Sequence, residues 1–154
     1  MTNKDFVLDP LRRAGLREAQ TVRDGAVAGT LDGTAVIAAE GYMPDYPEDG
    51  KRDFTAVPVG SPYRYDGQVY KLWQQHNANG QTDWTPDKAV SLWDICHTKD
   101  PAAAKPYVPP QGTRGLYQTG ECMIWTDGQV WRSLTGNNAY TPETYPAGWE
   151  QVAV

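Results

Sequence analysis

Short runs of β-branched and aromatic residues, separated by turn residues, dominate the hydrophobic pattern of the chain. The clearest example lies within residues 115–152, where Asp127-Gly128 separates two such runs. This arrangement predicts a β-hairpin, because a tight turn needs a positive φ that Gly adopts freely. Thr141-Pro142 then ends any strand ladder, since Pro has no N–H to donate. Trp149 follows as a bulky apolar anchor, so the stretch predicts one small β module.

The same order of residues occurs once earlier in the chain. Residues 66–70 read Asp-Gly-Gln-Val-Tyr, and residues 127–131 read Asp-Gly-Gln-Val-Trp. Between the Asp-Gly and the Thr-Pro the two copies differ by five residues, which fall within an Asn/Gly-rich loop, where a change of length costs little. We therefore predict two tandem copies of one module. The other matched positions are Thr85-Pro86 with Thr141-Pro142, Trp93 with Trp149, and Gly60 with Gly120.

The N-terminal third of the chain has a helical pattern instead. Asp9-Pro10 supplies an N-cap and a Pro at the first helical position, and good helix formers follow over Leu11–Arg23. Asp32 can cap a second short helix over Thr34–Glu40, which Gly41 ends. Helices of these lengths are marginal alone, so they must pack on the β modules, on another copy or on a larger assembly.

These patterns predict a mainly β protein: two small tandem β modules, each a short antiparallel sheet with a hairpin, preceded by a short helical N-terminal segment. Residues 1–50 are expected to form a helical attachment or oligomerisation segment. The modules are expected at residues 51–97 and 115–154. Residues 98–114 form a Pro-rich linker between them, whose prolines predict an extended, semi-rigid spacer.

Charge and hydropathy each argue against one class of partner. The 154 residues include 14 Lys and Arg and 19 Asp and Glu, a net charge of −5, with no basic run that would attract phosphate. No apolar run approaches the length of a membrane span, and the N-terminus lacks a signal-peptide pattern. We therefore expect no nucleic-acid partner, no membrane partner and synthesis in the cytoplasm.

Aromatic residues are the most distinctive part of the composition, with 6 Trp and 9 Tyr against 2 Phe. Their flat rings with a polar handle suit sugar-binding faces and wet interfaces, although small β modules also use large aromatics as core. Strand alternation places Trp73 on the face opposite Tyr70, so we expect Trp73 to be exposed. We assign four residues to the structural core: Tyr70, Trp93, Trp131 and Trp149.

Residues for catalysis or metal binding are poorly placed in the sequence. His76 and His97 are the only histidines, and neither has a nearby Ser or Cys in a nucleophile setting. Several acids near the repeated Thr-Pro and Trp could form a carboxylate pair, but such residues are mostly exposed surface groups. No cluster has metal-ligand spacing, and no Gly-rich phosphate loop is present. The sequence thus predicts no enzyme, no cofactor and no metal site.

The two cysteines, Cys96 and Cys122, are too few for a disulfide scaffold. Each lies at the border of its module, so the two could pair. Free thiols are the favoured alternative for a cytoplasmic product.

The repeated order of Tyr, Gly, Asp-Gly, an aromatic residue, Thr-Pro and Trp resembles the chitin-binding-type carbohydrate-binding modules of families five and twelve. These modules occur on chitinases and, in variant form, on phage tail and virion proteins. The phage-type form is closest at Asp83-Trp84-Thr85-Pro86 and at Ser91-Leu92-Trp93. The resemblance covers residues 54–96 and 115–152, in two tandem copies. The family's usual Gly-Asp before the first core strand is absent here, and the chain has Gly-Ser and Gly-Glu instead.

The resemblance implies a sugar-binding surface, and the residues suggest where it lies. A pyranose ring offers an apolar face of C–H groups that stacks on an aromatic ring, while flanking amides bond its hydroxyls. The candidate binding residues are Trp73, Trp84, Gln75 and Asn77 in the first module, and Tyr140 and Asn138 in the second.

Three functions follow from these observations. The first is a non-enzymatic binder of surface polysaccharide in a phage virion or tail, with other virion proteins and further copies of the chain as partners of the N-terminal segment. The second is a purely structural virion protein, a decoration or adaptor subunit that uses the fold for protein contacts. The third is an accessory subunit of a glycoside hydrolase, which is weak because no catalytic domain is attached in this chain.

Overall fold

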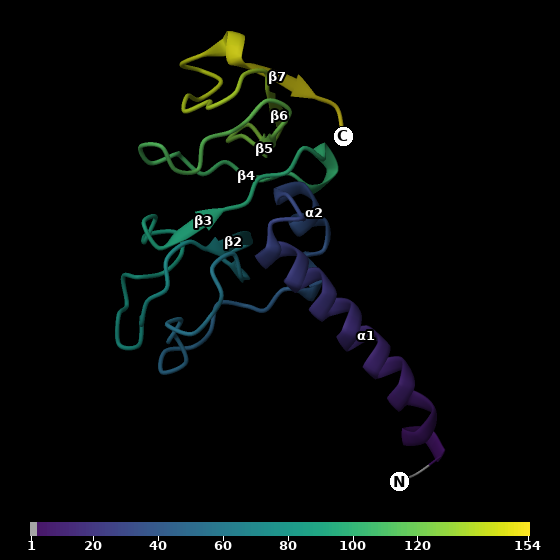
Figure 1. The fold of residues 1–154 in the computed structure, drawn as a ribbon. Helices are drawn as coiled ribbons and strands as arrows, with labels where there is room; N and C mark the ends of the chain where they lie inside the picture. The colour runs from purple at the N-terminus through teal and green to yellow at the C-terminus, as the bar shows by residue number, and fades with distance from the viewer. Residues whose placement is uncertain (1–2) are drawn as a thin grey trace.

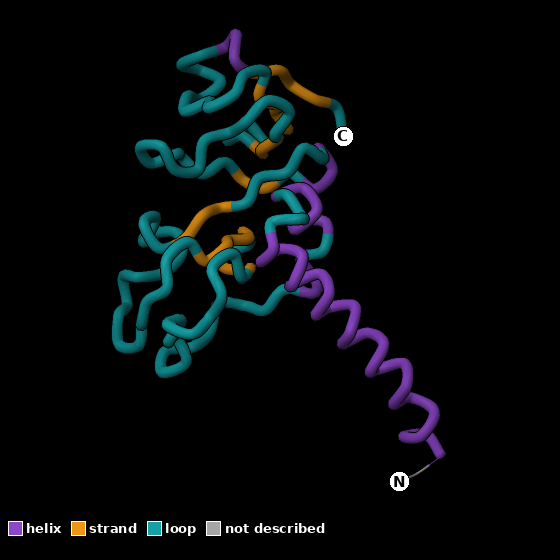
Figure 2. Tube along the Cα trace, viewed as in Figure 1, coloured by secondary structure: helices purple, strands orange, loops and turns teal. Residues whose placement is uncertain are grey.

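The computed structural model describes residues 3–154, with side chains described from Gly15 onward. Its regular structure includes two small sheets and two α-helices. Helix α1 spans Asn3–Ala28 and helix α2 spans Gly33–Ala38. The sheets lie one beyond the other along the molecule, and α1 extends away from the first sheet (Figure 1). Loops make up most of the body, as Figure 2 shows.

The first sheet has three antiparallel strands in the order β1-β2-β3, at Pro62–Tyr65, Gln68–Leu72 and Trp93–Ile95. Asp66 and Gly67 join β1 to β2 with φ values of 49° and 75°. A positive φ at both central residues is typical of the type I′ turn, whose twist matches that of the flanking strands. The Asp-Gly pair therefore forms the hairpin that the sequence predicts.

The second sheet has four strands in the order β4-β5-β6-β7. They span Lys105–Pro106, Cys122–Ile124, Val130–Ser133 and Trp149–Val152. Strands β5, β6 and β7 are antiparallel neighbours, whereas β4 pairs with β5 in parallel. The described chain is thus a small β-rich fold with two short sheets.

The β5–β6 hairpin uses a longer connection than the β1–β2 hairpin. Trp125 N–H donates to Gln129 O over 2.9 Å, which leaves three residues between them. Gly128 closes this loop with a φ of 78°. A three-residue connection with a left-handed last residue is the next commonest hairpin type after the two-residue turns. Asp-Gly therefore turns the chain in both sheets, in two different geometries.

The segment 98–114 is part of the second sheet and not only a spacer. Strand β4 lies within it, and Tyr107 N–H continues the pairing to Ile124 O at 2.9 Å. Pro106 occupies the sheet edge, where its missing N–H costs no ladder bond. Its carbonyl accepts a hydrogen bond from Gln68 Nε2 of the first sheet over 3.0 Å. The backbone is extended, as the prolines predict, but this extended segment serves as an edge strand that joins the two sheets.

The N-terminal helices differ in extent from the sequence prediction. Helix α1 runs through Asp9-Pro10 and continues beyond Arg23. Ala26 is buried against the first sheet, so packing extends the helix past its predicted end. Asp32 caps α2 as predicted, and its Oδ1 accepts a hydrogen bond from Ala35 N–H over 2.9 Å.

Three buried clusters hold these elements together. One joins the N-terminal helices to the first sheet through Ala26, Val36, Ile37, Met43, Val69 and Cys96. A second fills the other face of the first sheet with Phe54, Tyr70, Leu72, Ala78 and Trp93. A third lies in the second sheet and contains Tyr117, Met123 and Trp149. Because Val36 and Ile37 share a cluster with Val69 of β2, the N-terminal segment completes the core of the first sheet.

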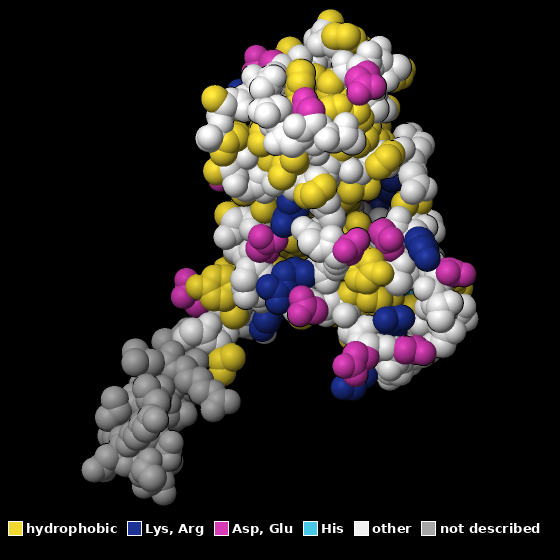
Figure 3. Space-filling view, turned by 180° about the vertical axis from the view of Figure 1, so that it is seen from behind, with side chains coloured by type: hydrophobic (Ala, Val, Ile, Leu, Met, Phe, Trp, Pro, Cys, Tyr) yellow, Lys and Arg dark blue, Asp and Glu magenta, His cyan; other side chains and the backbone are white. Residues whose placement is uncertain are grey.

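Short 3₁₀ helices occupy three connections, at Glu40–Tyr42, Pro101–Ala103 and Pro146–Gly148. Among the described residues, neither α-helix is long and apolar enough to cross a bilayer. On the face shown in Figure 3, charged side chains gather mainly around the first sheet, whereas apolar side chains are frequent over the second.

Candidate functional site

The aromatic residues divide into a buried set and an exposed set. Tyr70, Trp93 and Trp149 are buried, with 4%, 2% and 3% of their surface exposed. The Trp93 ring meets Phe54 edge-on, with 5.1 Å between ring centroids. Trp149 Nε1 donates to Tyr140 O over 2.9 Å. The large rings at the ends of the two repeats therefore close the two small cores.

Trp131 does not lie in the core to which the sequence assigned it. Its side chain is only half-buried at the margin of the third cluster. Its Nε1 lies 3.3 Å from Asp127 Oδ2 in the β5–β6 loop. The longer loop brings this carboxylate to the indole, and a half-exposed Trp commonly keeps its N–H bonded in this way. The core assignment of Trp131 is therefore corrected to a position at the sheet margin.

Trp73 lies at the surface with 52% of its area exposed. It follows the end of β2, and its backbone N–H donates to Leu92 O over 2.8 Å. One face of its ring is covered by Arg114, whose guanidinium carbon lies 3.9 Å from the ring centroid. Arg114 Nη2 also lies 3.4 Å from Asp94 Oδ1 in β3. This cation–π contact stabilises the indole in one orientation and leaves part of the ring open to solvent.

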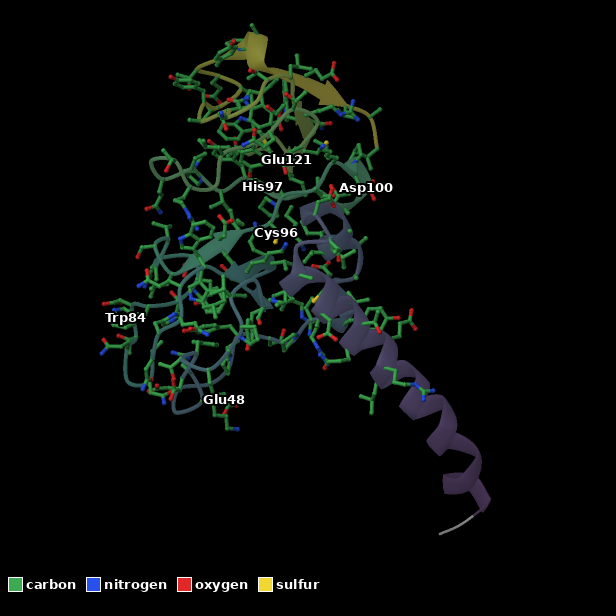
Figure 4. All side chains as sticks on the ribbon, in the orientation of Figure 1. Glu48, Trp84, Cys96, His97, Asp100 and Glu121 are labelled. Atoms are coloured by element: carbon green, nitrogen blue, oxygen red, sulfur yellow. The ribbon has the colours of Figure 1, made fainter. Side chains whose placement is uncertain are left out.

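Trp84 is 39% exposed in the long loop between β2 and β3. Figure 4 places it on the side of the molecule away from α1. Its ring lies 6.3 Å from that of His76, and its carbonyl accepts a hydrogen bond from the Tyr46 hydroxyl over 3.4 Å. One side of the indole therefore lies near His76, and the rest of its surface is open to solvent.

Gln75 and Asn77 are exposed, but part of each amide stabilises the loop. Gln75 Nε2 donates to Val57 O over 2.8 Å. Asn77 Oδ1 accepts from Asn79 N–H over 3.0 Å, as Asn side chains commonly do in turns. The remaining polar atom of each amide, Gln75 Oε1 and Asn77 Nδ2, is the part available to a ligand.

Asn138 is excluded as a ligand-binding residue by its burial. Only 2% of its surface is exposed. Its Nδ2 donates to Ser133 Oγ over 3.0 Å and to Gly148 O over 3.1 Å, and its Oδ1 accepts from Tyr140 N–H over 3.1 Å. These three bonds use the amide to hold the loop against the second sheet. The prediction that Asn138 contacts sugar is therefore wrong.

Tyr140 has the largest exposure of the candidate rings, 55%, and it has a neighbour that the sequence reasoning missed. The rings of Tyr140 and Tyr145 lie 5.8 Å apart with an angle of 31° between their planes. Tyr145 is also exposed. Its counterpart in the repeat is Ala89, so the comparison of the two copies did not point to it. Together the two rings form a small aromatic surface on the loop between β6 and β7.

His97 and the two cysteines are largely withdrawn from solvent. His97 is half-buried, its Nε2–H donates to Gly115 O over 3.0 Å, and its ring stacks on Tyr117 with 3.8 Å between ring centroids. Burial lowers the pKa of His97 below its ordinary value. Cys96 and Cys122 are both free and buried. Burial raises the pKa of Cys96 to about 12, so its thiol stays protonated.

Across the described residues, no three His, Cys, Asp or Glu side chains lie close enough together to hold a metal ion. No protein-family model matches the chain, and no curated protein matches it.

Proposed function

We propose that the protein is a non-enzymatic carbohydrate-binding component of a phage virion or tail. It attaches to surface polysaccharide through two tandem modules of the chitin-binding-like type. The exposed aromatic rings bind sugar, and the helical N-terminal segment attaches the chain to other virion proteins or to further copies of itself.

The tandem arrangement is supported by matched strand pairing in the two sheets. Leu72 pairs with Trp93 across β2 and β3, and Ser133 pairs with Trp149 across β6 and β7. The turns before these strands also agree. Gly60, with a φ of 92°, donates to Leu72 O over 2.7 Å. Gly120, with a φ of 90°, donates to Ser133 O over 2.8 Å. A positive φ favours Gly at both positions.

The observation that carries the proposal is the exposure of the same two positions in both copies. Trp84 corresponds to Tyr140, and both rings are exposed. Trp73 corresponds to Leu134, and both are exposed, at 52% and 46%. A large apolar side chain at an exposed loop position adds nothing to the core, and its recurrence in both copies indicates a surface that binds.

The chemistry of these side chains fits sugar better than it fits a charged ligand. Indole and phenol rings present flat apolar faces for the C–H groups of a pyranose, and their N–H and O–H groups remain in water. A shallow surface of this kind buries little area, so each module binds weakly. Many copies on one particle raise the effective concentration, and the assembled particle binds far more tightly than a monomer.

A glycan array tests the proposal. The array carries chitin, peptidoglycan and mucin glycans, and the protein is applied both as a monomer and coupled in many copies to a bead. We expect the multivalent form to bind at least one polysaccharide and the monomer to bind it weakly. Failure of both forms on all three classes of glycan would overturn the carbohydrate function.

The alternative is a purely structural virion protein, a decoration or adaptor subunit that makes only protein contacts. The contact between Arg114 and Trp73 favours it, because part of one candidate ring is already covered by the chain itself. The two functions are separated by the array together with a binding assay on virion proteins. A structural subunit binds the virion proteins and no glycan.

A further inference from the structure

A polar cleft lies between the two sheets, separate from the exposed rings. Its volume is about 330 Å³, within the range of small-ligand sites. Strands β2 and β3 supply Lys71 and Asp94 to one wall, and the second repeat supplies Gln118 and Glu121 to the other. Figure 4 shows Glu121 and His97 in the space between the sheets. Junctions between structural units are a common place for ligand sites.

The wall from the first sheet differs from its counterpart in the second. Arg132 and Glu150 face each other across β6 and β7 and form an ion pair at 3.2 Å. Lys71 and Asp94 occupy the matched register across β2 and β3. In the described chain these two do not pair with each other. In the second sheet the two charged side chains therefore pair with each other, whereas in the first sheet Lys71 and Asp94 line the cleft.

Each of these charges has one partner at the margin of the cleft. Lys71 Nζ donates to Leu31 O over 3.3 Å, which leaves further N–H donors on the ammonium group. Asp94 Oδ1 lies 3.4 Å from Arg114 Nη2, which leaves its second oxygen as an acceptor. The wall thus offers both donors and acceptors at fixed positions.

The opposite wall is held by bonds among its own residues. Gln118 Nε2 donates to Asn137 Oδ1 over 3.1 Å, and Asn137 N–H donates to Gln118 Oε1 over 3.0 Å. Gln118 N–H donates to Glu121 Oε1 over 2.6 Å. The second oxygen of Glu121 and Nδ2 of Asn137 take no part in these bonds. Glu121 is half-buried, and this burial raises the pKa of its carboxyl group.

Arg114 connects the wall of the cleft to the exposed Trp73, which does not itself line the cleft. Lys71 and Trp73 are two residues apart, so they project to the same face of the first sheet. Arg114 links the two features, because it stacks on the Trp73 ring and reaches Asp94 in the cleft wall. A chain of sugar units that stacks on Trp73 can therefore place its next unit in the cleft.

We propose that this cleft is a second, concave binding site that takes one sugar unit bearing an acetamido group or several hydroxyls. Such groups both donate and accept hydrogen bonds, and they match the Lys71 and Asn137 donors and the Asp94 and Glu121 acceptors. The site holds two acids and two cations around its rim, counting Arg114, so it favours a neutral sugar over an ion. The proposal rests on the carbohydrate function proposed above and adds a site to it.

The test uses the full chain and a tetramer of N-acetylglucosamine as the probe. Backbone amide shifts are followed by NMR at millimolar probe concentration. Two variants remove cleft contacts with little strain: Glu121→Gln keeps the shape of the side chain, and Asn137→Gly suits the φ of 47° at that position. Gln151→Ala, on the exposed strand β7, is the matched control.

We expect shifts at Gln118, Glu121 and Asn137, and a roughly threefold to tenfold weaker affinity for each cleft variant, the effect of losing one hydrogen bond. The control should bind as the native chain does. Shifts confined to the Trp84 and Tyr140 loops, with both cleft variants binding normally, would overturn the cleft site and leave the carbohydrate function standing. Absence of any shift, together with a silent glycan array, would overturn both.

Discussion

Trp93 and Trp149 occupy matched positions in the repeat, but only one of the two indoles has a hydrogen-bond partner. Trp149 Nε1 donates to Tyr140 O over 2.9 Å. Trp93 Nε1 is buried without a partner among the described residues. Replacing each by Phe removes the same atoms, so the two variants form a matched pair that isolates the contribution of the N–H group.

The expected difference follows from these two environments. Both substitutions lose packing, because each ring is almost wholly buried, with 2% and 3% of its surface exposed. Trp149→Phe also loses a hydrogen bond that contributes about 0.5–1.5 kcal/mol to the free energy of unfolding. Trp93→Phe instead removes a buried unpaired donor, whose burial costs about 1–3 kcal/mol. The lost bond makes Trp149→Phe more destabilising, and the removed unpaired donor makes Trp93→Phe less so. We therefore expect Trp93→Phe to be less destabilising than Trp149→Phe by about 1.5–4.5 kcal/mol, the sum of the two contributions.

Urea unfolding followed by far-UV circular dichroism measures this difference, with each midpoint and slope fitted separately. The Trp93→Ala and Trp149→Ala variants set the scale, because each should lose roughly 3–5 kcal/mol when a large aromatic site is emptied. Equal losses for the two Phe variants, or a larger loss for Trp93→Phe, would refute the reasoning about the unpaired N–H.

Three further predictions concern other parts of the chain. Val36→Ala should lower the free energy of unfolding, measured in urea, by about 2 kcal/mol, because Val36 is fully buried against the first sheet. In the same assay, deletion of residues 1–41 should leave the first sheet unfolded. Asn138→Ala should cost about 1–3 kcal/mol in thermal unfolding without changing glycan binding, since it leaves three bonded groups without a partner. The native chain should lose stability as the pH falls below about 6.5, because burial lowers the pKa of His97 and the unfolded chain then binds the proton more readily. This loss should continue down to the folded pKa and be absent in His97→Gln, and an unchanged pH profile in that variant would contradict the assignment.

Local features of the fold were predictable from the sequence because they depend on adjacent residues. The Asp66-Gly67 turn needs two positive φ values, and its residue types supply them. Asp32 caps α2 through a bond to a residue three positions away. The burial of Trp93 and Trp149 follows from the position of a large ring at the end of a short module.

The features that were missed depend on contacts between distant segments. Arg114 reaches Trp73 from the segment 98–114, and no local pattern places a guanidinium on that ring. Strand β4 lies in a Pro-rich segment, which is extended in a spacer and in an edge strand alike. Asn77 and Asn138 both lie in the Asn/Gly-rich loop of their repeat, but one is exposed and the other buried. Closure of the second loop over Asn138 is a matter of packing, which residue type alone does not determine.

The central claim, that exposed rings at matched positions bind polysaccharide, is tested most directly by one comparison. The variants Trp84→Ala, Tyr140→Ala and their combination are coupled in equal numbers to beads, and their retention on insoluble polysaccharide is compared with that of the native chain. Both rings are exposed, so the variants should keep the native circular dichroism spectrum and unfolding midpoint. We expect each single variant to be retained less and the double variant to lose retention almost completely. Native retention by a correctly folded double variant would contradict the claim.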